Sequence, residues 1–159
     1  MSEKTFQQIV ELLDNNKTQY KTFEHAPVRT SEEASKVRGV PLHSGAKAMI
    51  VRSESKFYEF ILGAHKRLDL NAVKRILNTR SASLASRDEV LEVTDCVPGS
   101  VPPFGNLWNI PVYADNSLSE TINFNAGLLE KSVQMFLKDW KRIVKPIEES
   151  FSESETSLN

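Results

Sequence analysis

The chain has 159 residues, of which 40% are hydrophobic and 26% are charged, and its formal net charge at neutral pH is −1. This length and composition predict one globular domain with a full hydrophobic core. The near-zero charge argues against a protein that wraps DNA or RNA, but it leaves contact with the end of an RNA open.

The cysteine content and the N-terminus both fit a reducing compartment. Cys96 is the only cysteine, so neither an internal disulfide nor a cysteine-based zinc site can form. The first residues are polar and include Glu3, which fits neither a secretory signal nor an acidic-poor transit peptide. No apolar run approaches the roughly 20 residues that span a bilayer. We therefore expect a cytoplasmic protein with no membrane partner.

Hydrophobic periodicity predicts a mixture of helices and strands. In chain order, the pattern predicts a helix at 4–15, a strand at 20–24, a helix at 31–37, a hairpin of strands at 46–52 and 57–64, a helix at 70–77, a short strand at 81–85, a helix at 87–93, strands at 110–114, 121–126 and 132–135, and a helix at 136–144. This mixture is typical of an α+β domain on a mixed or strongly bent sheet, not of a regular doubly wound sheet.

Local signals support the helix boundaries. Thr30 and Glu33 have the spacing of a capping box, as do Ser86 and Glu89 further along. Asp69 is placed to cap the helix that follows it. From residue 148 to residue 159 the chain is rich in serine and glutamate, with few apolar residues. We interpret this end as a disordered tail behind a domain of residues 1–147.

A loop at residues 97–106 concentrates proline and glycine. It holds three of the seven prolines and two of the six glycines, so its backbone is shaped in advance. The N–H groups of Ser100, Val101, Phe104, Gly105 and Asn106 could then point at a ligand and form an oxyanion or phosphate cradle. The alternative is a tight surface turn between a helix and a strand.

Lys47 stands in an apolar strand, among alanine, methionine, isoleucine and valine. Its ammonium either faces water at a strand end or lies in a pocket, where it could polarise a carbonyl or neutralise a phosphate. His25, His43 and His65 lack the spacing of a helical metal pair, so we expect no metal site. No dinucleotide or P-loop fingerprint is present, and we expect no cofactor. Cys96 fits a buried, inert thiol.

The order of several short motifs resembles the YbaK/EbsC/ProX family, the editing domains associated with prolyl-tRNA synthetase and their free-standing relatives. The motifs, in chain order, are His25-x-Pro-Val, Thr30-x-Glu-Glu-Ala, Gly45-x-Lys47, Arg67-Leu-Asp69, Ala85-Ser86 and Pro98-Gly99-x-x-Pro102-Pro103-Phe104-Gly105. The resemblance spans roughly residues 18–145. It implies a single compact domain with a mixed, barrel-like sheet flanked by helices.

The resemblance also implies an activity, which is hydrolysis of the ester between a wrong amino acid and the terminal adenosine of a tRNA. Lys47 matches the family's hallmark site residue, and Gly99 belongs to the loop that presents backbone groups to the substrate. We expect the substrate-binding residues to be His25, Pro27, Thr30, Ala46, Ser100, Val101, Pro103, Phe104, Gly105, Asn125 and Gly127. The partners so implied are the tRNA acceptor end and an aminoacyl-tRNA synthetase.

The amino acid that is removed stays open within a small class, namely alanine, cysteine, serine or threonine. Residues 123–127 hold no histidine, unlike some family members, which puts any named subgroup in doubt. Asn125 either hydrogen-bonds a polar group of the amino acid or is a structural residue at a strand end. Two other functions compete with a trans-editing deacylase: a non-catalytic module that binds tRNA or a synthetase, and a hydrolase of another small ester or an adenylate.

Overall fold

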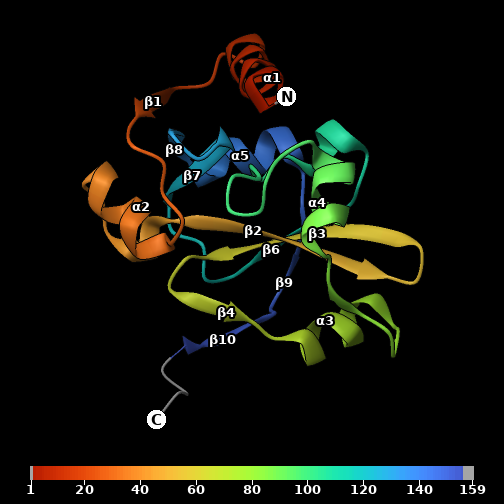
Figure 1. Cartoon of the computed structure of the whole chain (residues 1–159). Helices are drawn as coiled ribbons and strands as arrows, with labels where there is room; N and C mark the ends of the chain where they lie inside the picture. The colour runs from red at the N-terminus through yellow and green to blue at the C-terminus, as the bar shows by residue number, and fades with distance from the viewer. Residues whose placement is uncertain (1, 156–159) are drawn as a thin grey trace.

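A computed structural model of the chain describes residues 2–155 (Figure 1). The helices are α1 (Ser2–Asn15), α2 (Ser31–Arg38), α3 (Leu70–Leu77), α4 (Arg87–Thr94) and α5 (Leu137–Val144), with 3-10 turns η1 (Leu42–Ser44) and η2 (Gly105–Trp108). The strands are β1 (Tyr20–Glu24), β2 (Ala46–Ser53), β3 (Lys56–Gly63), β4 (Lys66–Leu68), β5 (Ser83–Leu84), β6 (Val112–Asp115), β7 (Thr121–Leu128), β8 (Lys131–Phe136), β9 (Ile147–Glu149) and β10 (Ser152–Ser154).

The strands form three sheets. The central one has five strands in the order β5-β2-β3-β6-β9, and its β3–β6 and β6–β9 pairs are parallel. An antiparallel sheet has the order β1-β8-β7, and β10 pairs with β4. The α+β class is confirmed, but the expected barrel-like sheet is not closed, because β5 and β9 remain edge strands. One parallel bridge, from Gly45 to Asn123, links the two larger sheets.

The central sheet is buried on both faces, and this explains the apolar run in its middle strand. In β3 all five residues from Glu59 to Gly63 are buried. Ile61 belongs to a core shared with Phe124 of β7 and Trp140 of α5, whereas Phe60 belongs to a core with Val73 of α3. A strand covered on both faces carries consecutive apolar residues in place of alternation.

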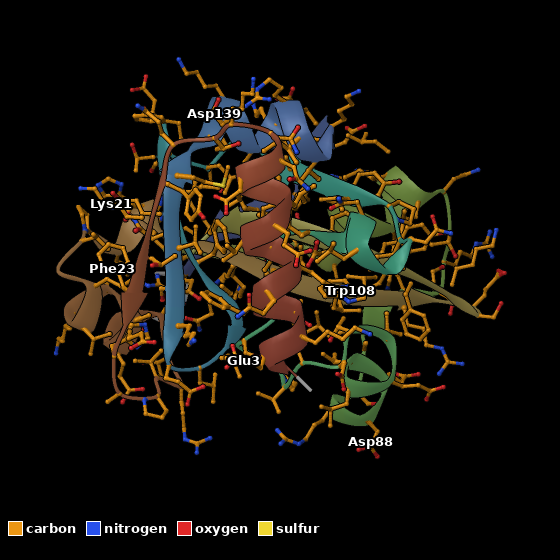
Figure 2. The ribbon with its side chains drawn as sticks, turned by 90° about the horizontal axis from the view of Figure 1, so that it is seen from above. Glu3, Lys21, Phe23, Asp88, Trp108 and Asp139 are labelled. Atoms are coloured by element: carbon orange, nitrogen blue, oxygen red, sulfur yellow. The ribbon has the colours of Figure 1, made fainter. Side chains whose placement is uncertain are left out.

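The helices begin and end where local chemistry requires it. The Thr30 hydroxyl accepts the Glu33 N–H, and the Glu33 carboxylate accepts the Thr30 N–H, so the capping box of α2 is formed as predicted. Gly39 ends that helix at φ 69°, a left-handed conformation that suits glycine. At the N-terminus, α1 lies alongside the three-stranded sheet (Figure 2) and buries Ile9 and Leu13 completely.

The C-terminal segment corrects the predicted disordered tail. Residues 147–149 form β9 beside β6, and residues 152–154 form β10 beside β4. Between them Phe151 is only 1% exposed, and its N–H donates to the Asp115 carboxylate at 2.6 Å. The prediction of disorder is therefore wrong for residues 148–155, and residues 156–159 lie outside the described residues. Within residues 2–155, no helix has the length and apolar character needed to cross a membrane.

Candidate active site

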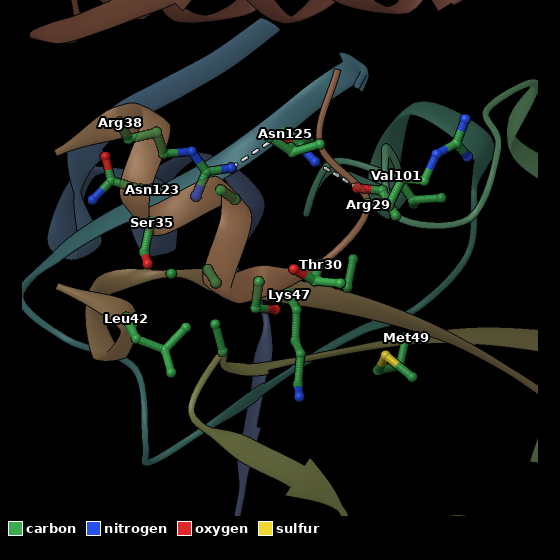
Figure 3. Close-up of a pocket in the computed structure, with 18 of the residues that line it drawn as sticks. Arg29, Thr30, Ser35, Arg38, Leu42, Lys47, Met49, Val101, Asn123 and Asn125 are labelled. Atoms are coloured by element: carbon green, nitrogen blue, oxygen red, sulfur yellow. Dashed lines mark hydrogen bonds between the residues drawn. The ribbon is translucent and has the colours of Figure 1, made fainter. Parts of the chain in front are cut away.

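A pocket of about 190 Å³ lies where the two larger sheets meet (Figure 3). Its walls come from α2 and η1, the first residues of β2, the Gly99 loop and β7. Gly45 packs tightly beside the end of β3, because a Cβ there would lie 2.7 Å from the Ala64 Cβ, closer than side chains pack. The Gly45–Asn123 bridge then fixes the start of β2 against β7.

Six residues expected at the site line this one pocket, although they come from four separate segments: Thr30, Ala46, Lys47, Gly99, Val101 and Asn125. Lys47 follows the bridge on β2, and its side chain is 24% exposed. Its ammonium points away from Arg38 and Asn125 (Figure 3) and lies 3.7 Å from the Glu155 carboxylate, just beyond β10. The lysine is thus at the pocket and within reach of solvent.

The Gly99 end of the loop is held by a side chain of β7. Gly99 has φ 93°, a conformation that glycine adopts without strain. Its carbonyl oxygen accepts a 2.6 Å hydrogen bond from Asn125 Nδ2. The N–H of Val101, two residues later, has no hydrogen-bond partner within residues 2–155. The Gly99 N–H likewise has no partner there, so two backbone donors of the loop, at residues 99 and 101, remain unused beside the pocket.

Three of the other expected donors of the loop serve the fold, so their prediction as ligand-facing groups is wrong, and Asn106 does not line the pocket. Ser100 N–H donates to the Val97 carbonyl and Phe104 N–H donates to the Pro102 carbonyl. Gly105 N–H donates to the Glu59 carboxyl at 2.8 Å. The loop is thus hydrogen-bonded to itself and to Glu59 of β3, and these bonds occupy N–H groups that the sequence suggested were free to face a ligand.

Neighbouring positions of the loop are structural for related reasons. The Pro103 carbonyl accepts the indole N–H of Trp140 at 2.8 Å. The Phe104 ring is fully buried and packs against Phe124 with ring centroids 5.6 Å apart. Gly127 N–H donates to the Ser100 carbonyl across a bulge in β7. None of these residues lines the pocket.

The structure also places His25 and Pro27 outside the pocket lining. Pro27 is exposed. The Nε2 of His25 forms a 2.8 Å hydrogen bond with Ser132 Oγ. Ser132 is fully buried and also accepts from Arg38 Nε at 2.9 Å. His25 therefore supports a polar network that reaches the pocket wall through Arg38.

Sequence reasoning missed Arg38, which ends α2 and lines the pocket. Burial lowers the pKa of its guanidinium to about 10, which still leaves it positively charged at neutral pH. Arg29 and Lys47 are the other cations of the lining, which includes no Asp, Glu, His or Cys among the described residues. The pocket is therefore electropositive and suits a ligand that carries negative charge or oxygen acceptors.

The remaining titratable groups near the loop lie away from the pocket. The Cys96 thiol is buried, and that burial raises its pKa, so it is not poised as a nucleophile. Glu59 is fully buried under the loop, and burial raises its pKa well above the ordinary value, while the Gly105 N–H opposes part of that rise. Its second oxygen has no hydrogen-bond partner in the part of the chain that the structure describes. A buried carboxyl with a raised pKa thus anchors the far end of the loop.

The raised pKa of Glu59 predicts that the stability of the protein depends on pH. An unfolded glutamate ionises near pH 4.5, whereas the folded Glu59 stays protonated to higher pH. The wild type should therefore lose stability relative to Glu59→Gln as the pH rises above about 4.5, until the folded carboxyl ionises. Melting temperatures of both proteins from pH 4 to pH 9 measure this. A difference that stays constant over the range would contradict the assignment.

Comparison with known proteins identifies the family. Residues 25–143 match the aminoacyl-tRNA editing domain. Over 149 residues the chain is 35% identical to a multifunctional Ser/Thr-tRNA deacylase, ProXp-y, of Escherichia coli K12, covering 89% of each chain. Over 103 residues it is 31% identical to a proline–tRNA ligase of Staphylococcus epidermidis, covering 65% of this chain and 18% of the ligase.

The fold agrees with these matches. A solved structure described as a proposed trans-editing enzyme for prolyl tRNA synthetase superposes with a TM-score of 0.81 at 21% identity, over 94% of this chain and 98% of the other. The matched residues 25–143 include the whole pocket lining, from Val28, just before α2, to Asn125 of β7. The chain therefore belongs to the aminoacyl-tRNA editing domain family.

Proposed function

We propose that this protein is a free-standing aminoacyl-tRNA deacylase, which hydrolyses the ester of a small, wrongly attached amino acid on a tRNA, with prolyl tRNA as the first candidate. The observation that carries the proposal is the pocket itself. It gathers Lys47, the fixed Gly99 loop and an unused Val101 N–H in an electropositive cavity of a size suited to a small acyl group.

The chemistry needs no side-chain nucleophile. Water attacks the ester carbonyl carbon, the carbonyl oxygen becomes negatively charged, and the bond to the ribose oxygen then breaks to give a free amino acid and a tRNA. A backbone N–H that meets the developing oxyanion contributes about 3 kcal/mol in acyl-transfer enzymes, and Val101 offers such a donor. The Lys47 ammonium would hold the terminal phosphate or orient the carbonyl.

The pocket lining lacks a general base among the described residues, since it holds no Asp, Glu or His. We therefore propose that a ribose hydroxyl of the substrate helps to activate the water. A substrate in which hydrogen replaces that hydroxyl should lose most of its hydrolysis rate, measured as release of labelled amino acid. Hydrolysis at an unchanged rate would contradict this part of the proposal.

Serine and threonine are the first candidates for the amino acid. The relative named for Ser/Thr-tRNA deacylation shares 35% identity with this chain over 149 residues, and the polar wall of the pocket agrees with a hydroxylated side chain. Alanine and cysteine would also fit by size, because a difference of one methylene group changes the free energy of binding by only about 1–3 kcal/mol.

The proposed partners follow from the substrate. The tRNA acceptor end is the nucleic acid that the pocket would contact, and an aminoacyl-tRNA synthetase is a proposed protein partner, since related sequence occurs within proline–tRNA ligases. The formal net charge of −1 fits contact with one end of a tRNA better than contact along its whole length. We propose the cytoplasm as the place of action.

A panel of charged tRNAs tests the function. The purified protein is incubated with tRNAs carrying alanine, serine, threonine, cysteine or proline, each on its cognate tRNA and on prolyl tRNA, and amino acid release is measured. Release of one or two of the non-proline amino acids is the expected result. A folded protein that binds tRNA but releases none of them would contradict the proposal in favour of the non-catalytic binding module.

A further inference from the structure

The guanidinium of Arg38 is fixed by neutral partners. Its Nε–H donates to Ser132 Oγ at 2.9 Å, and its Nη2–H donates to Asn125 Oδ1 at 2.9 Å (Figure 3). Within residues 2–155 no carboxylate lies within ion-pair distance of it. The carbonyl end of α2 supplies only partial negative charge. The charge of Arg38 is therefore not balanced by the protein.

The same contacts decide which edge of Arg38 is left for a ligand. Nη1 makes no hydrogen bond to the described residues, while Nε and Nη2 are both engaged. A guanidinium has N–H donors and no acceptor, so its binding partner must be an oxygen with a lone pair. The engaged nitrogens hold the plane of the group in place, and because Arg38 lines the pocket, Nη1 is the nitrogen left for a ligand there.

The other polar groups at this end of the pocket already have partners. Asn125 donates to the Gly99 carbonyl and accepts from Arg38. Asn123 donates to Ser44 Oγ and accepts from Gln134 Nε2. Both amides are thus held in place by protein partners, each with one N–H left over, and the question of which group recognises a polar substrate, which the sequence left open for Asn125, extends to Arg38.

The position of Lys47 indicates which part of the substrate reaches Arg38. The Lys47 ammonium points away from Arg38, toward the segment that follows β10 (Figure 3). If the nucleotide end of the ester lies at Lys47, the acyl side chain extends toward the inner wall that holds Arg38. A serine or threonine side chain offers an oxygen there, and an alanine side chain offers none.

We propose that Nη1 of Arg38 donates a hydrogen bond to the side-chain hydroxyl of a seryl or threonyl group, and that Arg38 is thereby a specificity-determining residue of the pocket. The inference rests on the proposed deacylase function. A site built to pair a substrate hydroxyl rejects the analogue that lacks it, because its own polar group is then desolvated without a partner. The pocket should accordingly prefer seryl over alanyl esters.

The test compares kcat/KM on seryl-tRNA and alanyl-tRNA for the wild type, Arg38→Gln and a control, Arg142→Gln, which alters an exposed arginine on α5. Arg38→Gln should lower the seryl value by about 10- to 100-fold, the range of a hydrogen bond to a charged group. Its alanyl value should change by less than about 3-fold, and Arg142→Gln should change neither.

Equal losses on both substrates would overturn the proposal, because a phosphate-binding or purely structural Arg38 would affect seryl and alanyl esters alike. If Arg38→Gln fails to fold, the wild type decides through inhibition by seryl- and alanyl-adenosine analogues joined by an amide. The seryl analogue should inhibit at a concentration at least about 10-fold lower, and equal inhibition, or none, overturns the proposal. A wild type that releases no amino acid would instead count against the proposed function.

Discussion

Lys47→Ala should lower kcat/KM for the released amino acid by about 100- to 1,000-fold, the cost of removing one electrostatic group from an acyl-transfer site. The substitution should lower turnover without lowering stability, since the side chain is 24% exposed and the one ion pair that it makes within residues 2–155, with Glu155, is a surface contact. Such exposed pairs contribute about 0–1 kcal/mol to stability. Rates of amino acid release and the melting temperature, measured on the same preparation, check both statements.

Lys56→Ala is the matched control for this variant. Lys56 begins β3 in the same hairpin and is exposed, so its removal changes the net charge equally without touching the pocket. Activity that survives in Lys47→Ala at the level of Lys56→Ala would show that the lysine does not take part in the reaction. Loss of tRNA binding in Lys47→Ala, with turnover preserved at saturating substrate, would assign it to binding alone.

Phe151→Ala should lower the free energy of unfolding by about 3–5 kcal/mol, the usual cost of removing a buried phenylalanine side chain. Phe151 is 1% exposed and meets the Phe60 ring edge-on, with centroids 4.9 Å apart. It lies in a core with Val73 of α3. Urea unfolding of wild type and variant gives the difference directly.

Phe136→Ala provides the comparison, because Phe136 is 43% exposed at the end of β8 and should change stability by less than about 1 kcal/mol. Equal, small effects of the two substitutions would contradict the placement of residues 147–155 as part of the domain. A large effect of Phe151→Ala alone would establish that the C-terminal segment is packed into the core of the domain.

The parts of the fold that were predicted correctly depend on neighbours in sequence. The capping box of Thr30 and Glu33 and the hairpin of β2 and β3 are local features, and both are present. The C-terminal strands could not be predicted in the same way. Their hydrogen bonds go to β6 and β4, which are distant in sequence, and one phenylalanine in a Ser/Glu-rich segment gives no periodicity.

The residues of the candidate site also differ in whether their sequence neighbours could reveal them. Lys47 and Gly99 were singled out from their own surroundings, a charge in an apolar strand and a glycine in a rigid loop, and both line the pocket. Arg38 stands in a polar helix, where an arginine predicts a solvated face. Its burial depends on Asn125 and Ser132, about ninety residues away. The engagement of Gly105 N–H by Glu59 is equally non-local.

The most direct test of the proposed deacylase function is the lifetime of the ester between serine and a prolyl tRNA, measured with and without the purified protein. The protein should accelerate the release of serine and spare proline on the same tRNA, and Lys47→Ala should abolish the acceleration. Equal lifetimes with and without folded wild-type protein, repeated with threonine, alanine and cysteine, would contradict the proposed deacylase function.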